Sequence, residues 1–490
     1  MAYKLNPFTG KLDYYQSNTL QSVPVNELPS SASDGTQVFC PDGAGFGKQG
    51  NAGQTTAYSS GGKWYRTDTN TEVVPNPLSI WDVGSTFNNY NPNTGAFNKT
   101  LISASTLNGI YTENYFIDMP INGYTIQVYV KYQIKNSLRN LGTAPCFIFT
   151  NGWGASVGDF TNFANLNYAV VQYDWRGTFN GTYSYPSTLM TLYPAALNRL
   201  NQVTNPNANY VSQMSVANIS DVRNQDMYYW YAIPRRVLAY TKTLTADIDN
   251  TKIGFYGNSW GGQIAYSMAI EPDIKATIAQ YGNGWIHYWK TNSAWPYSIP
   301  YTEPAFSDGN NYYISTLESQ AYAKYARNPV LWMSSTNDFH GQFDRGFRNF
   351  EITPVQGSYA FKVNASHDIT GFEQNLQLWF DKHLKGTAIT WPTNPNTIPS
   401  IVSAGTAKVT ITPSNPEDVT AVQFYYALVT ADAMSRTWVA ATTTNNGNGT
   451  WSAQFPYSDG SKYVFAYAQI TYSNTIIVCS KQAAFIPNNL

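Results

Sequence analysis

One short segment of the sequence has the residue types and spacing of an activated serine. The segment Gly257-Asn258-Ser259-Trp260-Gly261 matches the pattern G-x-S-x-G. A strand-like run, residues 251–256, precedes it, and a helix-like run, residues 263–270, follows it. In a sharp turn of this kind side chains two residues before and after the serine would collide, so both positions require glycine. The spacing predicts Ser259 as a nucleophile.

A neutral serine needs a base to accept its proton, and the chain has only four histidines. His367 follows a predicted strand, residues 359–363, and precedes a predicted amphipathic helix, residues 372–384, so it is the predicted base. His287 lies soon after the serine and is expected to pack near the site. His383 lies in the last turn of the predicted helix, where a positive charge suits the helix dipole.

The acid that orients the base is expected between the serine and the histidine in the chain. Asp338 follows a predicted buried strand, residues 330–333, and is the predicted acid. Its carboxylate would fix the tautomer of His367 and stabilise the imidazolium ion. Asp344, six residues further on, is the main alternative. Asp368 is expected to cap the segment that follows it.

The predicted triad has a geometric consequence. Strands that carry the three residues must end at one edge of a parallel sheet, so His367 should lie within hydrogen-bond reach of Ser259. His340 is only two residues from Asp338, too close to be oriented by it, and neither His340 nor His383 is expected to reach the serine. Activity should fall at low pH as the base becomes protonated.

Two backbone N–H groups are predicted to bind the oxyanion. That of Trp260 begins the helix after the serine. The other is assigned to Trp153, in the loop Asn151–Ser156 that follows a short apolar strand, residues 146–150. The turn Asp174-Trp175-Arg176-Gly177 is expected to brace loops and to take no part in the chemistry.

The surrounding elements predict three regions. Residues 76–395 alternate strand and helix signals, which predicts an α/β fold with a mainly parallel sheet and helices on both faces. Within it, residues 124–134 alternate as an outer antiparallel strand, and Pro234 should kink the helix 225–244 or start a new one. Residues 400–490 show only short strands, as in an immunoglobulin-like β-sandwich. Residues 1–75 predict an irregular segment of loops and short strands.

Residues from about 100 to 390 resemble the α/β-hydrolase superfamily, nearest to its acetyl xylan esterase and dipeptidyl-peptidase-like branches. The motifs that carry the resemblance are Asn151-Gly152-Trp153-Gly154, Asp174-Trp175-Arg176-Gly177, Gly257-Asn258-Ser259-Trp260-Gly261-Gly262, Thr336-Asn337-Asp338-Phe339 and Ser366-His367. The added sandwich is similar to that of PhoPQ-activated pathogenicity-related proteins. The resemblance implies hydrolysis of an ester, or less often an amide, through an acyl-enzyme. Asn151 stands where many esterases have histidine.

Composition limits the partners. Only 12% of residues are charged, about half the usual share, and the net charge is -1, so no basic face is expected to bind nucleic acid. The three cysteines are far apart and lack metal-ligand spacing, and no metal or cofactor is expected. Neither a signal peptide nor a membrane-spanning run is expected.

The 38 Tyr and 14 Trp residues and the scarcity of charge are typical of extracellular proteins that face polysaccharides. With no export signal expected, this composition favours an extracellular or virion-associated protein released by cell lysis. The opening residues 6–13 resemble those of phage tail proteins, so residues 1–75 are predicted to attach the chain to other virion proteins. A tail protein would be expected to form a homo-oligomer.

Three function hypotheses follow. The first is a carbohydrate esterase that removes acetyl or similar groups from a polysaccharide, or acts on a small ester. The second is a peptidase, which would be expected to hold the substrate's amino group with a pair of carboxylates. The third is a structural or receptor-binding virion protein in which a hydrolase fold serves only as a scaffold.

Overall fold

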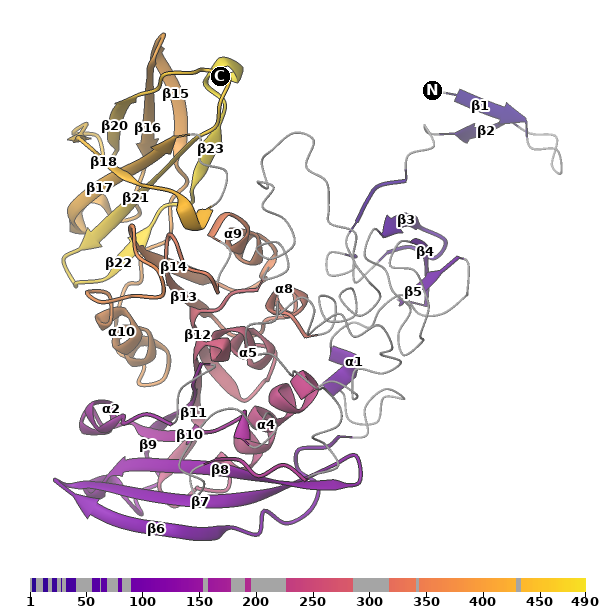
Figure 1. Ribbon diagram of the computed structural model, residues 1–490, viewed down its shortest axis with the longest axis vertical. Helices are drawn as coiled ribbons and strands as arrows, with labels where there is room; N and C mark the ends of the chain where they lie inside the picture. Colours follow the sequence, from indigo (N-terminus) through magenta and orange to yellow (C-terminus); the bar gives the residue numbers. More distant parts are fainter. Residues whose placement is uncertain are drawn as a thin grey trace.

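The computed structural model of the protein describes residues 2–5, 12–15, 20–23, 28, 32–40, 55–61, 63–67, 78–81, 90–152, 157–177, 190–194, 226–284, 317–340, 343–428 and 433–490. A nine-stranded sheet forms the centre of the fold (Figure 1). Its strands, from one edge to the other, are β6 (Thr100–Leu107), β7 (Ile110–Ile121), β8 (Tyr124–Lys135), β10 (Ala169–Tyr173), β9 (Ala144–Thr150), β11 (Ile248–Ser259), β12 (Ile274–Tyr281), β13 (Val330–Ser335) and β14 (Gly357–Lys362).

The sheet is mainly parallel, as the sequence predicts. The six neighbouring strands β10, β9, β11, β12, β13 and β14 run parallel to one another. Strands β8, β7 and β6 continue the sheet in antiparallel register, which confirms the antiparallel strand expected at residues 124–134, although β8 lies between β10 and β7 and not at the edge. Parallel strands end at the same edge of a sheet, so the loops that follow β11, β13 and β14 leave from one side.

Helices cover both faces of the sheet. In β9 the side chains of Cys146 and Ile148 join one apolar core, and those of Phe147 and Phe149 join another, as the alternation of a strand requires. The first core includes residues of α1 (Leu78–Trp81), α4 (Asp226–Thr241), α5 (Trp260–Met268) and α8 (Ser319–Ala323). The second includes residues of α2 (Thr161–Asn165) and α10 (Gln374–His383).

Helix α4 decides between the two outcomes expected of Pro234, a kink or the start of a new helix, only by excluding the second. Pro234 lies inside α4 and does not start a new helix. The helix is buried along residues 228–240, so packing on the sheet outweighs the loss of one backbone donor.

The C-terminal region is a β-sandwich, as predicted, and its strands do not continue the central sheet. Its first sheet consists of β15 (Ile398–Ser403), β16 (Thr406–Ile411), β20 (Trp451–Pro456) and β19 (Thr443–Asn445). Its second consists of β18 (Val439–Ala441), β17 (Val419–Leu428), β21 (Val464–Tyr472), β22 (Ile477–Cys479) and β23 (Ala483–Phe485). All the pairings are antiparallel.

The described part of the N-terminal region contains short strands with a small core. The strands are β1 (Ala2–Leu5), β2 (Leu12–Tyr15), β3 (Gln37–Cys40), β4 (Thr55–Ser60) and β5 (Lys63–Arg66). Strands β3, β4 and β5 form an antiparallel sheet, and residues such as Val38, Ala57 and Trp64 are buried against one another. Lys324 links this region to the main domain by donating a hydrogen bond to the carbonyl of Leu28 (2.9 Å).

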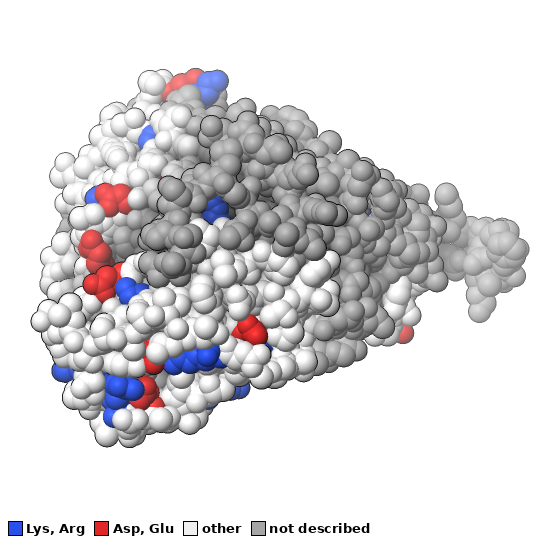
Figure 2. All heavy atoms as spheres, turned by 60° about the horizontal axis from the view of Figure 1, so that its bottom comes forward, with Lys and Arg blue, Asp and Glu red and all other residues white. Residues whose placement is uncertain are grey.

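The described surface is poor in charge. Figure 2 shows only scattered charged side chains among neutral ones on the face it presents. None of the described helices is long and apolar enough to cross a membrane. The three cysteines are buried and form no disulfide.

The sandwich packs on the end of the central sheet that carries β13 and β14 (Figure 1). Helix α9 (Phe343–Ile352) lies in this contact, and Phe343 packs against Trp438 and Tyr467 of the sandwich. Beside these rings Arg436 donates two hydrogen bonds to Asp344, each of 3.0 Å, and both side chains are fully buried. Gln482 donates a third hydrogen bond to the same carboxylate (2.9 Å).

Replacing Arg436 with Met should destabilise the protein, because it leaves the Asp344 carboxylate buried without its cation. We expect the free energy of unfolding in urea to fall by about 3–5 kcal/mol. Lys242→Met removes the exposed ion pair with Asp273 and should cost less than about 1 kcal/mol. Equal losses in the two variants would contradict the importance assigned to the buried pair.

Candidate active site

The serine lies at a turn that only glycines permit. Strand β11 ends at Ser259, and α5 begins at the next residue. Ser259 has a φ of 56° and a ψ of -117°, a conformation that L-residues rarely adopt. A Cβ atom on Gly257 would lie 1.9 Å from the carbonyl oxygen of Gly261, and one on Gly261 would lie 2.5 Å from the carbonyl oxygen of Thr150. The close approach of strand and helix thus explains the motif.

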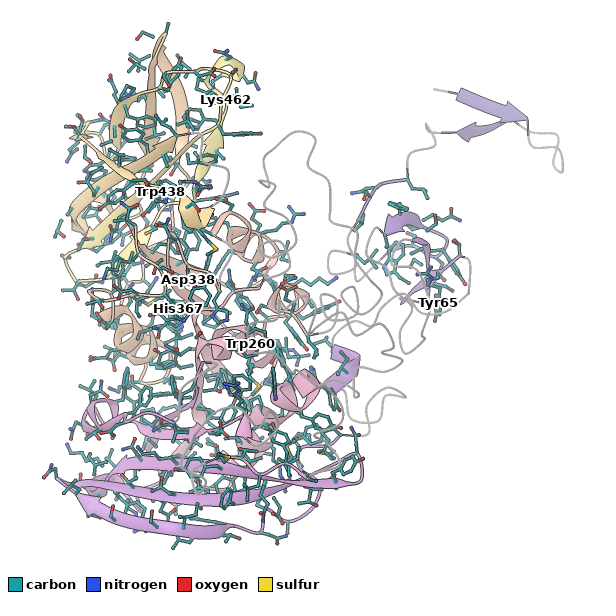
Figure 3. The ribbon with its side chains drawn as sticks, viewed as in Figure 1. Tyr65, Trp260, Asp338, His367, Trp438 and Lys462 are labelled. Carbon is teal, nitrogen blue, oxygen red and sulfur yellow. The ribbon has the colours of Figure 1, made fainter. Side chains whose placement is uncertain are left out.

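A histidine and an acid from two neighbouring loops meet this serine. Nε2 of His367 lies 2.8 Å from Oγ of Ser259, and its Nδ1 lies 3.1 Å from Oδ1 of Asp338. Asp338 follows β13, and His367 follows β14. The structure therefore brings the three predicted residues together in the predicted order, and Figure 3 shows Asp338 and His367 side by side near Trp260.

Further hydrogen bonds hold the carboxylate of Asp338 in place. Besides His367, Asp338 accepts a hydrogen bond from the backbone N–H of His340 (2.7 Å). The hydroxyl of Ser334 donates another, of 3.0 Å, to its second oxygen. Both oxygens of the carboxylate therefore act as acceptors. The side chain is fully buried, which keeps water from competing for it.

The other two aspartates have other partners. Asp344, the alternative acid, is bound by Arg436 and Gln482 and does not face His367. Asp368 accepts hydrogen bonds from the backbone and hydroxyl of Thr370, the capping role expected of it.

Two aromatic rings hold the plane of the imidazole. Tyr281 stacks on His367 with ring centroids 3.9 Å apart and an interplanar angle of 26°. Phe339 stacks on it as well, at 4.6 Å and 22°. His367 has a positive φ of 55°, so its backbone conformation is also an unusual one. Stacking and backbone together leave the ring little freedom to turn away from the serine.

The loops that carry the acid and the base are bonded to each other. The backbone N–H of Asn337 donates to the carbonyl of Ala365 (3.1 Å). In the opposite direction, the backbone N–H of Asn364 donates to the hydroxyl of Thr336 (2.9 Å). Movement of one loop therefore displaces the other.

The sandwich supplies no member of the triad, but it anchors both loops. The side-chain amide of Asn337 lies within 2.6–3.3 Å of the carbonyl oxygens of Ala433, Met434 and Arg436. Asn364 forms a two-way pair with the backbone of Trp438, at 2.7 and 2.8 Å. The labelled Trp438 lies on the sandwich side of the site in Figure 3.

The expectation that His340 stays away from the serine is wrong. Its Nδ1 lies 2.9 Å from Oγ of Ser259, and the residue is buried. Sequence proximity to Asp338 misled the prediction because the chain turns between the two residues. The backbone N–H of His340 faces the acid, and its ring faces the serine.

His383 takes no such place. His383 ends α10 and packs edge-on against Trp379, with ring centroids 4.4 Å apart. Burial lowers the pKa of His383 to about 4, so at neutral pH it does not carry the charge expected of it at a helix end. His287 lies outside the described residues.

Part of the predicted oxyanion site is visible. The backbone N–H of Trp260 is the first of α5, at the positive end of the helix dipole. Trp153, the other predicted donor, lies outside the described residues. The loop that leads to it contacts the serine, because a Cβ atom on Gly152 would lie 2.9 Å from Oγ of Ser259. The indole N–H of Trp175 holds this loop through the carbonyl of Asn151 (2.8 Å).

Asp174 has the bracing role expected of it. It accepts hydrogen bonds from the backbone N–H groups of Arg176, Gly177 and Thr191. Burial raises the pKa of its carboxyl, and these donors oppose the shift. Among the described residues no group of three or more His, Cys, Asp or Glu side chains is placed to hold a metal ion.

Comparison with known proteins gives only distant similarity. No protein-family model matches the chain, and no curated protein matches it. An acetyl xylan esterase from Paenibacillus sp. R4 aligns over 60% of this chain and 91% of its own, at 14% identity and a TM-score of 0.45. Acetyl xylan esterase 1 from Thermoanaerobacterium sp. JW/SL YS485 aligns over 59% and 88%, at 15% identity and 0.44. The acylaminoacyl peptidase of Pyrococcus horikoshii aligns over 78% and 53%, at 13% identity and 0.36.

The fold itself is established by the order of its parts. Ser259 lies between a central strand and a helix, Asp338 follows β13, and His367 follows β14. This is the chain order of the α/β-hydrolases. The chain thus has an α/β-hydrolase fold with an added C-terminal sandwich. What the site does rests on its own geometry.

Replacing Gly152 with Ala should impair the serine without unfolding the protein. The new Cβ would lie 2.5 Å from Cβ of Ser259, so one of the two must move. A shift of about 1 Å costs on the order of 10²-fold in rate, which we expect for labelling of Ser259 by a fluorophosphonate. Gly158→Ala is the matched control, since the atom nearest to its Cβ would be a ring atom of Phe160, at 3.3 Å. Unchanged labelling of the Gly152 variant would contradict the contact.

Proposed function

We propose that the protein is a serine hydrolase that cleaves carboxylic esters through an acyl-enzyme. The observation that carries this proposal is the continuous relay of hydrogen bonds from Ser259 through His367 to Asp338. Each member has the partner that its role requires: a nucleophile bonded to a base, and a base bonded to a buried acid. A histidine between aromatic rings and a serine at a strained turn are unlike a surface cluster formed by chance.

The geometry supports the following reaction. Oγ of Ser259 attacks the ester carbonyl while its proton passes to Nε2 of His367, and the resulting imidazolium ion is stabilised by Asp338. The C–O bond to the alcohol breaks as His367 returns the proton to the leaving oxygen. Water then repeats the cycle on the acyl-enzyme, with His367 again as base, and releases the acid.

The oxyanion formed in each step needs donors already in place. The backbone N–H of Trp260 is one, because α5 begins directly after the nucleophile. The second is proposed to come from the loop after β9, where Trp153 is the residue predicted from the sequence.

We further propose that the substrate is an acylated polysaccharide and that the reaction removes acetyl or similar groups. Support comes from the surface chemistry that the sequence provides, since 16% of the residues are aromatic and only 12% are charged. Aromatic faces stack on sugar rings, and a neutral surface does not repel neutral glycans. A peptidase would need charged groups that hold a peptide terminus, and no such set was identified in the sequence.

Ser259→Ala should abolish covalent labelling by a fluorophosphonate and lower ester turnover by on the order of 10⁶. Asp338→Asn should lower turnover by about 10⁴, because the histidine would lose its tautomer and its counter-ion. Both variants should keep the wild-type melting temperature within a few degrees. An alanine variant that retained a tenth of the activity would disprove the nucleophile.

The substrate class is tested with the same proteins. Wild-type protein should release acetate from acetylated xylan or a related glycan faster than it cleaves peptide p-nitroanilides, and the alanine variant should release none. Preference for the peptide substrates would favour the peptidase. Absence of any turnover, together with absence of labelling, would favour the scaffold hypothesis.

The location and partners are proposed from the sequence. Residues 1–75 would attach the chain to a larger assembly such as a virion, in which the chain would be homo-oligomeric, outside the cell. Deleting these residues should release the chain from the assembly. Retention would contradict this role.

A further inference from the structure

Two imidazole rings contact the same serine oxygen. Nε2 of His367 lies 2.8 Å from Oγ of Ser259, and Nδ1 of His340 lies 2.9 Å from it. A hydroxyl has one hydrogen and two lone pairs. Ser259 can therefore donate to only one of the two nitrogens, and the other contact requires an N–H on the ring.

The acid decides which ring donates. Both oxygens of Asp338 accept hydrogen bonds from other donors, so Nδ1 of His367, which lies 3.1 Å from Oδ1, is the donor in this contact and carries a hydrogen. In the neutral ring Nε2 of His367 is then unprotonated and accepts the hydrogen of Ser259. The contact with His340 remains, and only Nδ1–H of His340 can complete it.

We propose that His340 is a further catalytic residue, which donates a hydrogen bond from Nδ1–H to Oγ of Ser259. The proposal rests on the proposed function, because it assigns a role in the reaction of that serine. His340 does not act as a base in it. Asp338 faces the ring of His367 but only the backbone N–H of His340, so the acid orients one imidazole and the main chain of the other.

The ring is held in place from two sides. The backbone N–H of His340 is bound by Asp338, and its carbonyl accepts a hydrogen bond from the side chain of Gln263 (2.8 Å). Gln263 lies in α5, the helix after the nucleophile, and the hydroxyl of Ser319 fixes its amide. The edge of the ring contacts Trp260, with centroids 5.8 Å apart. His340 is thus tied to both the acid and the nucleophile.

A donor at this position acts where charge develops. As His367 removes the proton of Ser259 the serine oxygen becomes partly negative, and a hydrogen bond to a charged oxygen is stronger than one to a hydroxyl. The bond therefore stabilises the transition state more than the resting state, which is the condition for catalysis. The same oxygen is the leaving group when water cleaves the acyl-enzyme, so the donor serves both halves of the reaction.

The test compares substitutions that keep or remove the donor. Asn places its amide nitrogen close to the position of Nδ1, whereas Gln extends it toward that of Nε2. We expect His340→Ala to lower kcat on p-nitrophenyl acetate by on the order of 10²–10³, the cost of losing one preorganised donor. His340→Asn should recover most of this loss, and His340→Gln should not. His383→Asn is the control. His383 packs against Trp379 at the end of α10, so its replacement should leave kcat unchanged.

Two results would overturn the proposal. One is a folded alanine variant with wild-type kcat, and the other is a folded Asn variant as slow as the alanine variant. Equal losses of kcat in the alanine and asparagine variants would mean that the ring of His340 fills space or takes up a proton instead of donating one.

A second measurement does not depend on turnover. In the protein labelled with ¹⁵N-histidine, the signals that disappear in the His340 variants should show protonated Nδ1 and unprotonated Nε2 at neutral pH. The opposite tautomer would refute the donor assignment. Failure of the wild type to react with a fluorophosphonate would refute the proposed function instead, so the two failures are distinguishable.

Discussion

The close approach of strand β11 to helix α5 is the constraint on which the site depends. The two elements meet with no residue between them, and the carbonyl oxygens of Gly261 and Thr150 occupy the space that side chains would need. Ser259 takes up the resulting backbone strain. The surrounding sheet has to be large and well packed to hold such a conformation, and buried apolar side chains cover both of its faces.

Asp338 is the second centre of organisation. It binds the ring of His367, the main chain of His340 and the hydroxyl of Ser334, so one carboxylate fixes the acid loop, the imidazole of His367 and the backbone of His340. The sandwich contacts this part of the site through Asn337, the residue that precedes Asp338. An added domain thus supports the loops of the candidate site and supplies no member of its triad.

That the predicted serine, acid and base would meet could be expected from the sequence, because each follows a short apolar run that indicates a buried parallel strand. The glycine spacing around Ser259 has a direct steric cause, and positions such as Asp338 and His367 follow from where parallel strands end. The role of His340 could not be read in this way. It depends on how the chain turns directly after Asp338, and no periodic pattern in the sequence predicts that turn.

Other features escaped prediction for similar reasons. The long hairpin of β6 and β7 has a mixed pattern, since all residues of β6 are exposed and those of β7 alternate. The pairing of Asp344 with Arg436 joins residues far apart in the chain, and local sequence carries no sign of it. The sequence therefore offers Asp344 as an alternative acid, whereas in the structure Arg436 binds its carboxylate. Trp153 lies outside the described residues, so its backbone N–H as an oxyanion donor stays a prediction.

The contacts of Asn337 and Asn364 with residues 433–438 also bear on the order of assembly. A chain that emerges from the ribosome exposes its N-terminal part first. The nucleophile turn can form once β9, β11 and α5 have emerged, but the loops of the acid and the base lack their anchors until residues 433–438 have followed. The growing chain would therefore carry its serine early and complete its relay only near the end of synthesis, when the sandwich closes on β14.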